Sequence, residues 1–277
     1  MDRISAYVIA YNEAEKIEAA IKSLLWADEI LLADSFSSDA TAQIAQDLGA
    51  RVIQEPFEGF GALRNKAIEQ CRYEWIFSLD ADERCTPEVR DEVLEIIEKD
   101  TASNVFFVPR RNFFMGRWIR FSGYYPDYRQ PQLFKKDAMR YKLDFVHESY
   151  ELLTDRKPGY LKNAIWQTPY AGLSELIQKI DRYTDLGAKK LIAADKTPGM
   201  GIALSHGLFA FIKQYILKLG FMDGWTGLLL AFSNLEATFY KYAKHVEKTA
   251  DWHLPDTEAI MRVDQKEKGS EPMKTEP

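Results

Sequence analysis

The chain has 277 residues, of which 46% are hydrophobic and 13% aromatic, and its formal net charge is −6 at pH 7. A chain of this size and composition can bury one large core or two small ones. Its acidic balance argues against a general nucleic-acid-binding protein, because such proteins are usually basic.

Cysteine usage and the N-terminus indicate the compartment. The two cysteines, Cys71 and Cys85, belong to no CxxC or Cys/His cluster, so we expect free thiols in a reducing environment. The N-terminus enters a strand pattern at once and lacks the regions of a signal peptide. Lys213, Lys218 and Asp223 interrupt the most hydrophobic region, so no uncharged apolar run reaches the roughly 18 residues of a spanning helix. These features predict a cytoplasmic protein that does not cross a membrane.

Strand and helix patterns alternate over the first hundred residues. Helical patterns follow the expected strands, and Asn12 is predicted to cap the first helix with Glu15 as its capping-box partner. Alternation of this kind predicts a parallel sheet with right-handed crossovers. The expected strands are residues 4–10, 29–34, 51–54 and 75–80, and the expected helices after the first are about 38–48, 62–71 and 87–99.

Three of these strands end in polar residues. Ligands of such sheets bind beyond the carboxyl ends of the strands, and Tyr11-Asn12-Glu13, Asp34-Ser35 and Asp80-Ala81-Asp82 all fall there. Three polar strand ends in a row fit a nucleotide site. The GxGxxG fingerprint and the P-loop are both missing, which disfavours hydride transfer and ATP hydrolysis.

The stretch WIFSLDADE, residues 75–83, carries the strongest chemical signal. In a strand, Asp80 and Asp82 would share a face, and two carboxylates at a buried strand end repel each other. A hard divalent cation such as Mg²⁺ or Mn²⁺ would relieve that repulsion. The alternative is an acidic turn that caps the helix starting near Thr86.

The pattern changes after residue 99. Residues 105–125 are aromatic and basic, with a predicted hairpin turn at Met115-Gly116, and QPQLFKKD and DFVHESYEL are expected strands of a sheet that becomes mixed. This region could bind phosphate and stack on a sugar or base, or it could be an ordinary solvated basic face. Its cations and tyrosines are Arg110, Arg111, Arg117, Arg120, Arg129, Tyr124, Tyr125 and Tyr128.

From Leu173 the chain is predicted to be helical. Leu208, Phe211, Ile212, Tyr215 and Leu219 form a wide apolar stripe, whereas the lysines and Gln214 form a narrow polar one. Such a helix either lies in a membrane interface with its lysines extended toward water or packs against the first domain. The tail from about residue 262 has the composition of a disordered segment.

Four motifs together resemble a known family. VIAYNE, ADSFSSDAT, GFGALRNKA and LDADE, in this order within residues 4–150, are similar to the family 2 inverting glycosyltransferases of GT-A fold. The run FFMGRWIRFSGYYPDYRQPQLFKKD followed by VHE resembles bacterial lipopolysaccharide core glucosyltransferases that add glucose to an inner-core heptose. The resemblance implies an α/β fold, a Rossmann-like mixed sheet flanked by helices and followed by a helical region. The expected domains are residues 1–170 for transfer, 171–250 for a helical, membrane-interface region and 251–277 for an extended tail.

The resemblance also implies roles for single residues, with a UDP-hexose as donor. Asp34 would hold the uracil edge, and Arg64 would lie near the uracil or the diphosphate. Asp80 would lie near the ribose or the metal, and Asp82 would be the principal metal ligand. The remaining donor-binding residues are expected to be Ala10, Tyr11, Glu13 and Arg129.

Inversion by direct displacement needs a carboxylate that takes the proton of the acceptor hydroxyl. That base must lie across the sugar from the metal, so it cannot be Asp82. Glu148, within Val146-His147-Glu148, occupies the place where the family usually presents its base, and Asp127 is the competitor; neither is the third alternative. His147 could contact the metal or a phosphate, or be a structural histidine.

The leading hypothesis is a metal-dependent inverting transferase that moves a hexose, expected to be glucose, from a UDP-sugar to a lipid-linked acceptor of the lipopolysaccharide inner core. It would work peripherally on the inner face of the cytoplasmic membrane, without nucleic acid. The alternatives are transfer to another lipid- or polysaccharide-linked acceptor, nucleotidyl transfer, and a non-catalytic membrane-docking module.

Overall fold

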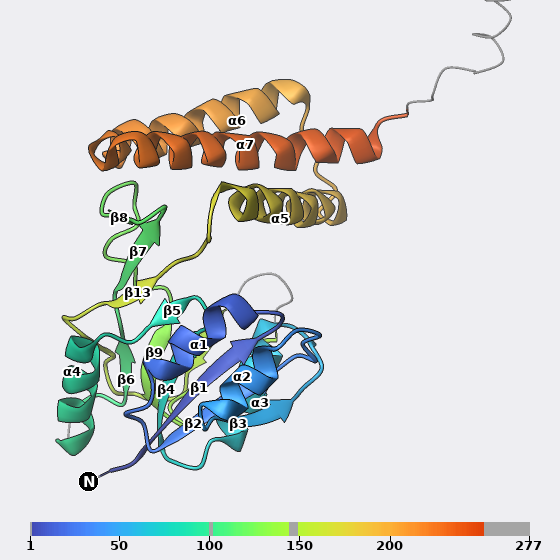
Figure 1. Ribbon diagram of the computed structural model, residues 1–277. Coiled ribbons are helices and arrows are strands. Elements are labelled where there is room, and N and C mark those ends of the chain that lie inside the picture. Colours follow the sequence, from blue (N-terminus) through green and yellow to red (C-terminus); the bar gives the residue numbers. More distant parts are fainter. Residues whose placement is uncertain (1, 100–101, 144–148, 252–277) are drawn as a thin grey trace, which may run out of the picture.

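A seven-stranded mixed sheet forms the centre of the N-terminal part of the protein. The computed structural model describes residues 2–99, 102–143 and 149–251 (Figure 1). The strand order is β12-β6-β9-β4-β1-β2-β3, in which β9 runs antiparallel to both β4 and β6. The expected change from a parallel to a mixed sheet is therefore confirmed. The strands are β1 (Ile4–Ala10), β2 (Glu29–Asp34), β3 (Arg51–Gln54), β4 (Trp75–Asp80), β6 (Val105–Phe107), β9 (Pro131–Lys135) and β12 (Gly159–Tyr160).

Helices cover both faces of this sheet, which explains why β1 and β2 are buried along their whole length. Alternate residues of β1 enter different cores: Ala6 and Val8 pack with α1, α2 and α4, whereas Tyr7 and Ile9 pack with α3. Burial on both faces holds the carboxyl ends of the strands in fixed positions. The helices are α1 (Ala14–Lys22), α2 (Thr41–Asp47), α3 (Phe60–Gln70) and α4 (Pro87–Glu98).

The residues that cap the helices agree only in part with the sequence prediction. Thr86 caps α4 by accepting a hydrogen bond from the backbone N–H of Val89, with Pro87 at the first helical position. The predicted cap of α1 is wrong, because Asn12 adopts a φ of 54° and Glu13 holds the N-cap position without a side-chain cap. The Asn12 side chain instead accepts a hydrogen bond from the Ser38 N–H at 2.8 Å. A contact with the neighbouring strand end thus replaces local capping.

A smaller sheet lies between the central sheet and the C-terminal helices, in the order β5-β13-β7-β8. Met115 and Gly116, both with positive φ, form the predicted hairpin turn between β7 and β8. β13 pairs with β5, which brings a segment far along the chain beside the acidic motif. These strands are β5 (Glu83–Arg84), β7 (Arg110–Phe114), β8 (Arg117–Ile119) and β13 (Ile165–Gln167), and a separate pair is formed by β10 (Met139–Tyr141) and β11 (Tyr150–Leu152).

The C-terminal helices form a layer away from the central sheet, and α6 and α7 lie side by side (Figure 1). In this layer α5 packs against α7, and the tip of the β7–β8 hairpin approaches the start of α7. A π-helical turn after α6 buries Gln214, so the predicted polar stripe is interrupted there. The elements are α5 (Leu173–Ala193), α6 (Met200–Ile212), the π-helical turn η1 (Lys213–Leu217), the 3₁₀ turn η2 (Gly220–Asp223) and α7 (Gly224–Thr249).

This helical layer leaves many large apolar side chains exposed, among them Leu208, Phe209 and Ile212 of α6. Within the part of the chain that the structure describes, one stretch, Met200–Leu217, is long and apolar enough to cross a membrane by length and composition, and only 17% of it is buried. Lys213 is the one charged residue within the stretch, so the stretch qualifies by length and composition although, as expected from the sequence, no uncharged run in it reaches 18 residues.

Candidate active site

Hydrogen bonds tie together the loops that follow β1 and β2. Ala10 lies in register with Asp34 at the ends of these strands. Ser37 donates its N–H to the Asp34 carboxylate at 2.9 Å, and the Asn12 N–H donates to the Ser37 hydroxyl at 2.8 Å. Asp34 is fully buried behind its own loop. The two strand ends therefore form one pre-organised edge.

Two aromatic rings stand exposed at this edge. The side chains of Tyr11 and Phe36 are both 61% exposed, and Phe36 is held at a φ of 58° while its N–H donates to Gln54. The Glu13 N–H donates to Thr41 at the start of α2, which places Glu13 in the same loop pair. Exposed aromatic faces beside a rigid backbone are suited to stacking on a flat ring such as a nucleobase.

The end of β4 carries an ion pair between a buried arginine and a partly exposed aspartate. Nη2 of Arg64 lies 2.7 Å from Oδ1 of Asp80, and the Arg64 guanidinium also lies over the Tyr141 ring. Burial alone would raise the pKa of Asp80, but the positive charges of Arg64, Arg110 and Arg129 outweigh it and keep that pKa below its ordinary value. Asp80 is therefore ionised near neutral pH, and α3 positions its partner.

Asp82 occupies a different environment two residues later. β4 ends at Asp80, so Asp82 lies in a turn, and the expectation that strand alternation places both carboxylates on one face is wrong. Nε2 of Gln167 donates to the Asp82 carboxylate at 3.2 Å. Burial, together with the charges of Asp80 and Glu83, raises the pKa of Asp82 to about 7, whereas Lys179 and Gln167 oppose the rise. The surroundings of Asp82 therefore disfavour its ionised form.

Glu83 stabilises this motif through hydrogen bonds from buried neighbours. It is fully buried, and it accepts hydrogen bonds from Nε of Arg110 at 2.5 Å, from the Asp80 N–H at 3.0 Å and from Gln132 at 3.1 Å. Burial raises the pKa of Glu83, and Arg110 opposes that rise. Because Arg110 is itself buried, it is not the surface phosphate ligand that the arginine-rich sequence suggested. Its charge fixes the turn that presents Asp82.

Further positive charges face the acidic motif from downstream segments. Nε of Arg129 lies 2.7 Å from Oδ2 of Asp127, and the Arg129 charge also acts on Asp80 and Tyr170. Lys179, on α5, donates to the Pro169 carbonyl at 2.6 Å, and its charge acts on Asp82. A negatively charged group bound beside Asp80 and Asp82 would meet these cations.

The acidic motif fits a divalent cation that a ligand helps to hold. Among residues 2–99, 102–143 and 149–251, no group of three or more His, Cys, Asp or Glu side chains is arranged as a complete metal site. Asp80 and Asp82 supply two carboxylates, and burial together with the charges of Asp80 and Glu83 raises the pKa of Asp82. Mg²⁺ and Mn²⁺ bind in this way, through one or two carboxylates and the oxygens of a phosphate.

The structure brings together most of the residues singled out in the sequence. Ala10, Tyr11, Glu13 and Asp34 lie at one part of the sheet edge, and a second group, Arg64, Asp80, Asp82, Asp127 and Arg129, lies at the neighbouring part. His147 and Glu148 lie outside the described residues. Sequence reasoning missed Gln167 and Lys179. The pairing of β13 with β5, far apart in sequence, brings Gln167 to Asp82, and Lys179 acts on Asp82 from α5.

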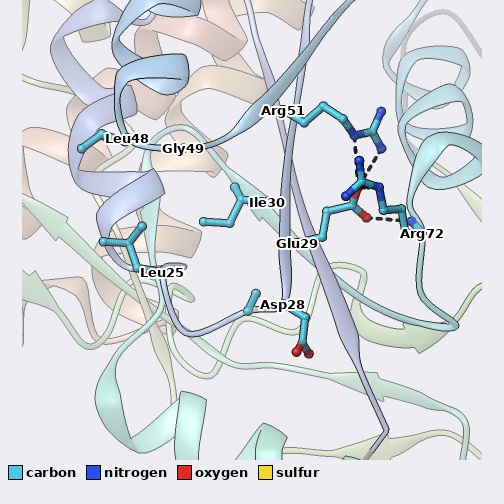
Figure 2. Close-up of a pocket in the computed structure, with 9 residues that line it drawn as sticks. Leu25, Asp28, Glu29, Ile30, Leu48, Gly49, Arg51 and Arg72 are labelled. Carbon is cyan, nitrogen blue, oxygen red and sulfur yellow. Dashed lines mark hydrogen bonds and ion pairs between the residues drawn. The ribbon is translucent and has the colours of Figure 1, made fainter.

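A cavity of about 270 Å³ lies at the opposite edge of the sheet, near the starts of β2 and β3 (Figure 2). Its charged wall is an ion cluster: the Glu29 carboxylate contacts Nη2 of Arg51 at 2.8 Å and the Arg72 N–H at 2.7 Å. These groups satisfy one another, so the cluster has a structural role at the amino ends of the strands.

Comparison with known proteins identifies the family. The sequence model of the family "Glycosyl transferase family 2" matches residues 5–153, which is more than half of the chain. This chain belongs to glycosyl transferase family 2. The matched residues include Asp34, Arg64, Asp80 and Asp82. The protein is therefore a glycosyltransferase, and its mixed sheet flanked by helices is the GT-A type fold that the motifs predicted.

Individual relatives of the glycosyltransferase are distant but match along most of their length. An "Uncharacterized glycosyltransferase" of Rickettsia bellii is 28% identical, over 87% of this chain and 85% of the relative. "Lipopolysaccharide core biosynthesis glycosyltransferase LpsC" of Rhizobium meliloti is 26% identical, over 90% of this chain and 96% of the relative. The crystal structure of S. aureus TarS 1-349 is similar with a TM-score of 0.48 and 15% identity, over 91% of this chain and 93% of that chain.

Proposed function

We propose that this glycosyltransferase moves a hexose, glucose by preference, from a UDP-sugar to a lipid-linked acceptor of the lipopolysaccharide inner core, with inversion and with a divalent cation. The observation that carries the proposal is the juxtaposition of Asp80 and Asp82 with the cations Arg64, Arg129 and Lys179. Carboxylates for a metal and cations for phosphates are the two parts that a nucleotide diphosphate leaving group needs.

The nucleoside would bind between the β1 and β2 ends. Asp34 would accept a hydrogen bond from the uracil edge, and its two bonds to Ser37 leave lone pairs on the carboxylate for that purpose. The exposed ring of Tyr11 offers a stacking face, with the backbone of Ala10 and the side chain of Glu13 beside it. Rigid loops reduce the entropy lost on binding.

The diphosphate would lie along the Asp80–Asp82 turn. Asp82 and Asp80 would hold Mg²⁺ or Mn²⁺, which as a Lewis acid would stabilise the negative charge that grows on the leaving group. Arg129 and Lys179 would bind phosphate oxygens from the other side, because both already act on these carboxylates. Gln167 would keep the Asp82 carboxylate oriented.

The acceptor hydroxyl needs a base on the far side of the sugar. We assign this role to Glu148, with Asp127 as the alternative, and His147 to a metal or phosphate contact. Asp127 is held by an ion pair with Arg129 and by a backbone bridge to Arg110. These contacts are compatible with Asp127 either positioning the acceptor or acting as the catalytic base. Replacement of each carboxylate by its amide separates the two.

The C-terminal helices and the named relative support the proposed acceptor class. α6 and α7 expose an apolar face that would keep the enzyme on the inner surface of the cytoplasmic membrane, where a lipid-linked saccharide is presented. The relative LpsC is named for lipopolysaccharide core biosynthesis. We propose residues 1–170 as the transfer domain, 171–250 as the membrane-facing helical region and 251–277 as a tail.

The proposal is tested by release of the nucleoside diphosphate, UDP or GDP according to the donor. The full-length enzyme is incubated with UDP-glucose, other UDP-hexoses or GDP-mannose, with Mn²⁺, Mg²⁺ or EDTA, and with or without heptose-terminated lipopolysaccharide. We expect UDP release from UDP-glucose that requires both the cation and the acceptor. Release only with a different lipid- or polysaccharide-linked acceptor would contradict the acceptor assignment, and full activity in EDTA would contradict the role of the cation.

A further inference from the structure

The turn between α6 and α7 is bound to the loop that carries Asp127 and Arg129. We call residues 216–225 the helical tip and residues 120–129 the hairpin-exit loop. The Ser122 N–H donates to the Lys218 carbonyl at 2.9 Å. A Cβ on Gly220 would lie 2.7 Å from the Ser122 hydroxyl oxygen, so the two segments approach too closely for any side chain at that position.

Asp223 forms the centre of this contact. Its carboxylate accepts hydrogen bonds from the Arg120 N–H at 3.0 Å, from the Phe121 N–H at 3.1 Å and from the Ser122 hydroxyl at 3.1 Å. Asp223 is only 7% exposed. Three hydrogen bonds to one buried carboxylate, from three successive residues, fix the start of the hairpin-exit loop.

Asp223 makes these bonds instead of capping its own helix. It occupies the N-cap position of α7, where an aspartate ordinarily accepts a hydrogen bond from an N–H of the first turn. Here its side chain makes no such bond, and the Thr226 hydroxyl donates to the Asp223 carbonyl instead. The carboxylate is therefore committed to a segment about one hundred positions earlier in the chain.

The contact continues toward the candidate active site. The Tyr124 N–H donates to the Phe121 carbonyl, and the Tyr124 carbonyl accepts from Nδ2 of Asn112. Gln214, buried in the π-helical turn, interacts with the Tyr124 side chain. Asp127 and Arg129 follow within five residues. The helical tip thus constrains the loop that presents both of these side chains.

The same tip exposes the residues best placed to enter a membrane. Phe221, Met222 and Trp225 are 48%, 54% and 52% exposed, and they flank the buried Asp223 in sequence. Asp223 is the only acidic residue between positions 196 and 235, whereas the three lysines of that stretch are exposed. An apolar surface with cations and no exposed acid is complementary to a bilayer that contains anionic lipid.

We propose that Asp223 is a positioning residue that links docking of the helical tip on an anionic bilayer to the order of the hairpin-exit loop. Docking would restrain the tip, and the Asp223 hydrogen bonds would carry that restraint to Asp127 and Arg129. The enzyme would then transfer sugar faster at the membrane than in solution. This inference rests on the proposed function for its effect on transfer, but not for the change in loop order.

Amide hydrogen exchange of the full chain tests the link directly. Exchange in residues 117–130 is followed by mass spectrometry alone, with phosphatidylcholine vesicles, and with vesicles containing phosphatidylglycerol, while flotation measures binding. In the wild type we expect anionic vesicles to slow exchange in the hairpin-exit loop. In Asp223→Asn we expect exchange about tenfold faster without vesicles, and no slowing by vesicles that still bind the protein.

Two further variants keep the test decisive. Ser122→Ala removes one donor to Asp223 and preserves Cβ, so it should weaken the response to vesicles without unfolding the protein. Asp195→Asn changes an exposed aspartate of the same helical region and should behave like the wild type. Loop exchange that does not change when the wild type binds vesicles, or equal slowing in Asp223→Asn, would overturn the proposal, as would failure of the wild type to bind anionic vesicles.

The activity assay separates this inference from the proposed function. For wild-type enzyme we expect anionic vesicles to increase transfer severalfold. For Asp223→Asn and Ser122→Ala we expect a higher KM for the acceptor and weaker UDP binding, because the hairpin-exit loop presents both Asp127 and Arg129. If the wild type transfers no sugar from any donor, the proposed function fails while the exchange experiment still decides the link.

Discussion

Replacement of Asp82 by asparagine should stabilise the protein when no cation is bound. The Asp82 carboxylate lies beside Asp80 and Glu83 and is partly buried, and its pKa is raised from 3.8 to about 7. The folded state therefore binds a proton more tightly than the unfolded state does. Asparagine keeps the shape and the contact with Gln167 but removes the charge. Loss of an unfavourable charge raises the free energy of unfolding.

The magnitude follows from the pKa. A rise from 3.8 to about 7 corresponds to an upper bound of about 4 kcal/mol at 1.36 kcal/mol per pKa unit. Solvent at the edge of the turn and relaxation of neighbouring cations reduce this, so we expect a gain of about 1–2 kcal/mol. Because the native pKa is raised, the penalty is absent below pH 4, grows between pH 4 and 7, and is complete above pH 7.

Urea unfolding at pH 4.5 and pH 8 measures this gain. Asp82→Asn should be more stable than wild type at pH 8 and nearly equal to it at pH 4.5. Asp137→Asn, which changes an exposed aspartate far from the motif, should match the wild type at both pH values. Equal stability of Asp82→Asn and wild type at pH 8 would refute the electrostatic argument.

The same variant should lose the response to metal. Mn²⁺ with UDP should raise the Tm of the wild type, because a ligand that binds only the folded state stabilises it by about 2.7 kcal/mol at one hundred times its Kd. In Asp82→Asn the added Mn²⁺ should raise the Tm no further than UDP alone. An unchanged Mn²⁺ titration by calorimetry would contradict the metal assignment.

Three further predictions concern the ion pair, the base and the helical layer. Arg64→Met should lower the free energy of unfolding by about 3 kcal/mol at pH 7 in urea titrations, because it leaves Asp80 unpaired. The pKa of Asp80 is depressed in the native state, so the stabilisation by the pair is present at neutral pH and is lost as pH falls through the folded pKa. An equal loss of stability at pH 7 and pH 2.5 would contradict this. Glu148→Gln should reduce kcat by about 10²–10⁴-fold with UDP-sugar affinity nearly unchanged by calorimetry, whereas wild-type turnover would move the base to Asp127. Phe209→Glu, at an exposed position of α6, should weaken flotation with vesicles at an unchanged Tm, and undiminished flotation would remove α6 from the docking surface.

Local patterns predicted the sheet because its strands are short apolar runs that end in chemistry-bearing residues. The ends of β1, β2 and β4 met the sequence expectation to the residue, and Asp34 and Asp80 lie where those runs stop. The signal is strong there because a strand buried on both faces is mostly apolar, so ionisable groups are found mainly at its ends.

Contacts between segments far apart in the chain determine the side-chain partners that the sequence did not predict. The sequence pattern makes Asn12 a helix-cap candidate, but its side chain accepts a hydrogen bond from the loop after β2 instead. Gln167 reaches Asp82 only because β13 pairs with β5, and Arg110 looked like a surface cation until Glu83 was found beside it. None of these partners is within hydrogen-bonding reach along the chain, so periodicity and propensity carry no information about them.

The fate of the glucosyl anomeric centre tests the central claim most directly. UDP-α-glucose labelled with carbon-13 at C1 is incubated with the enzyme, Mn²⁺ and heptose-terminated lipopolysaccharide, and the product is measured by NMR. We expect a β-linked glucose on the acceptor, formed only in the presence of the cation. An α-linked product would contradict direct displacement, and a labelled acceptor formed equally in EDTA would contradict the metal-assisted leaving group at Asp80 and Asp82.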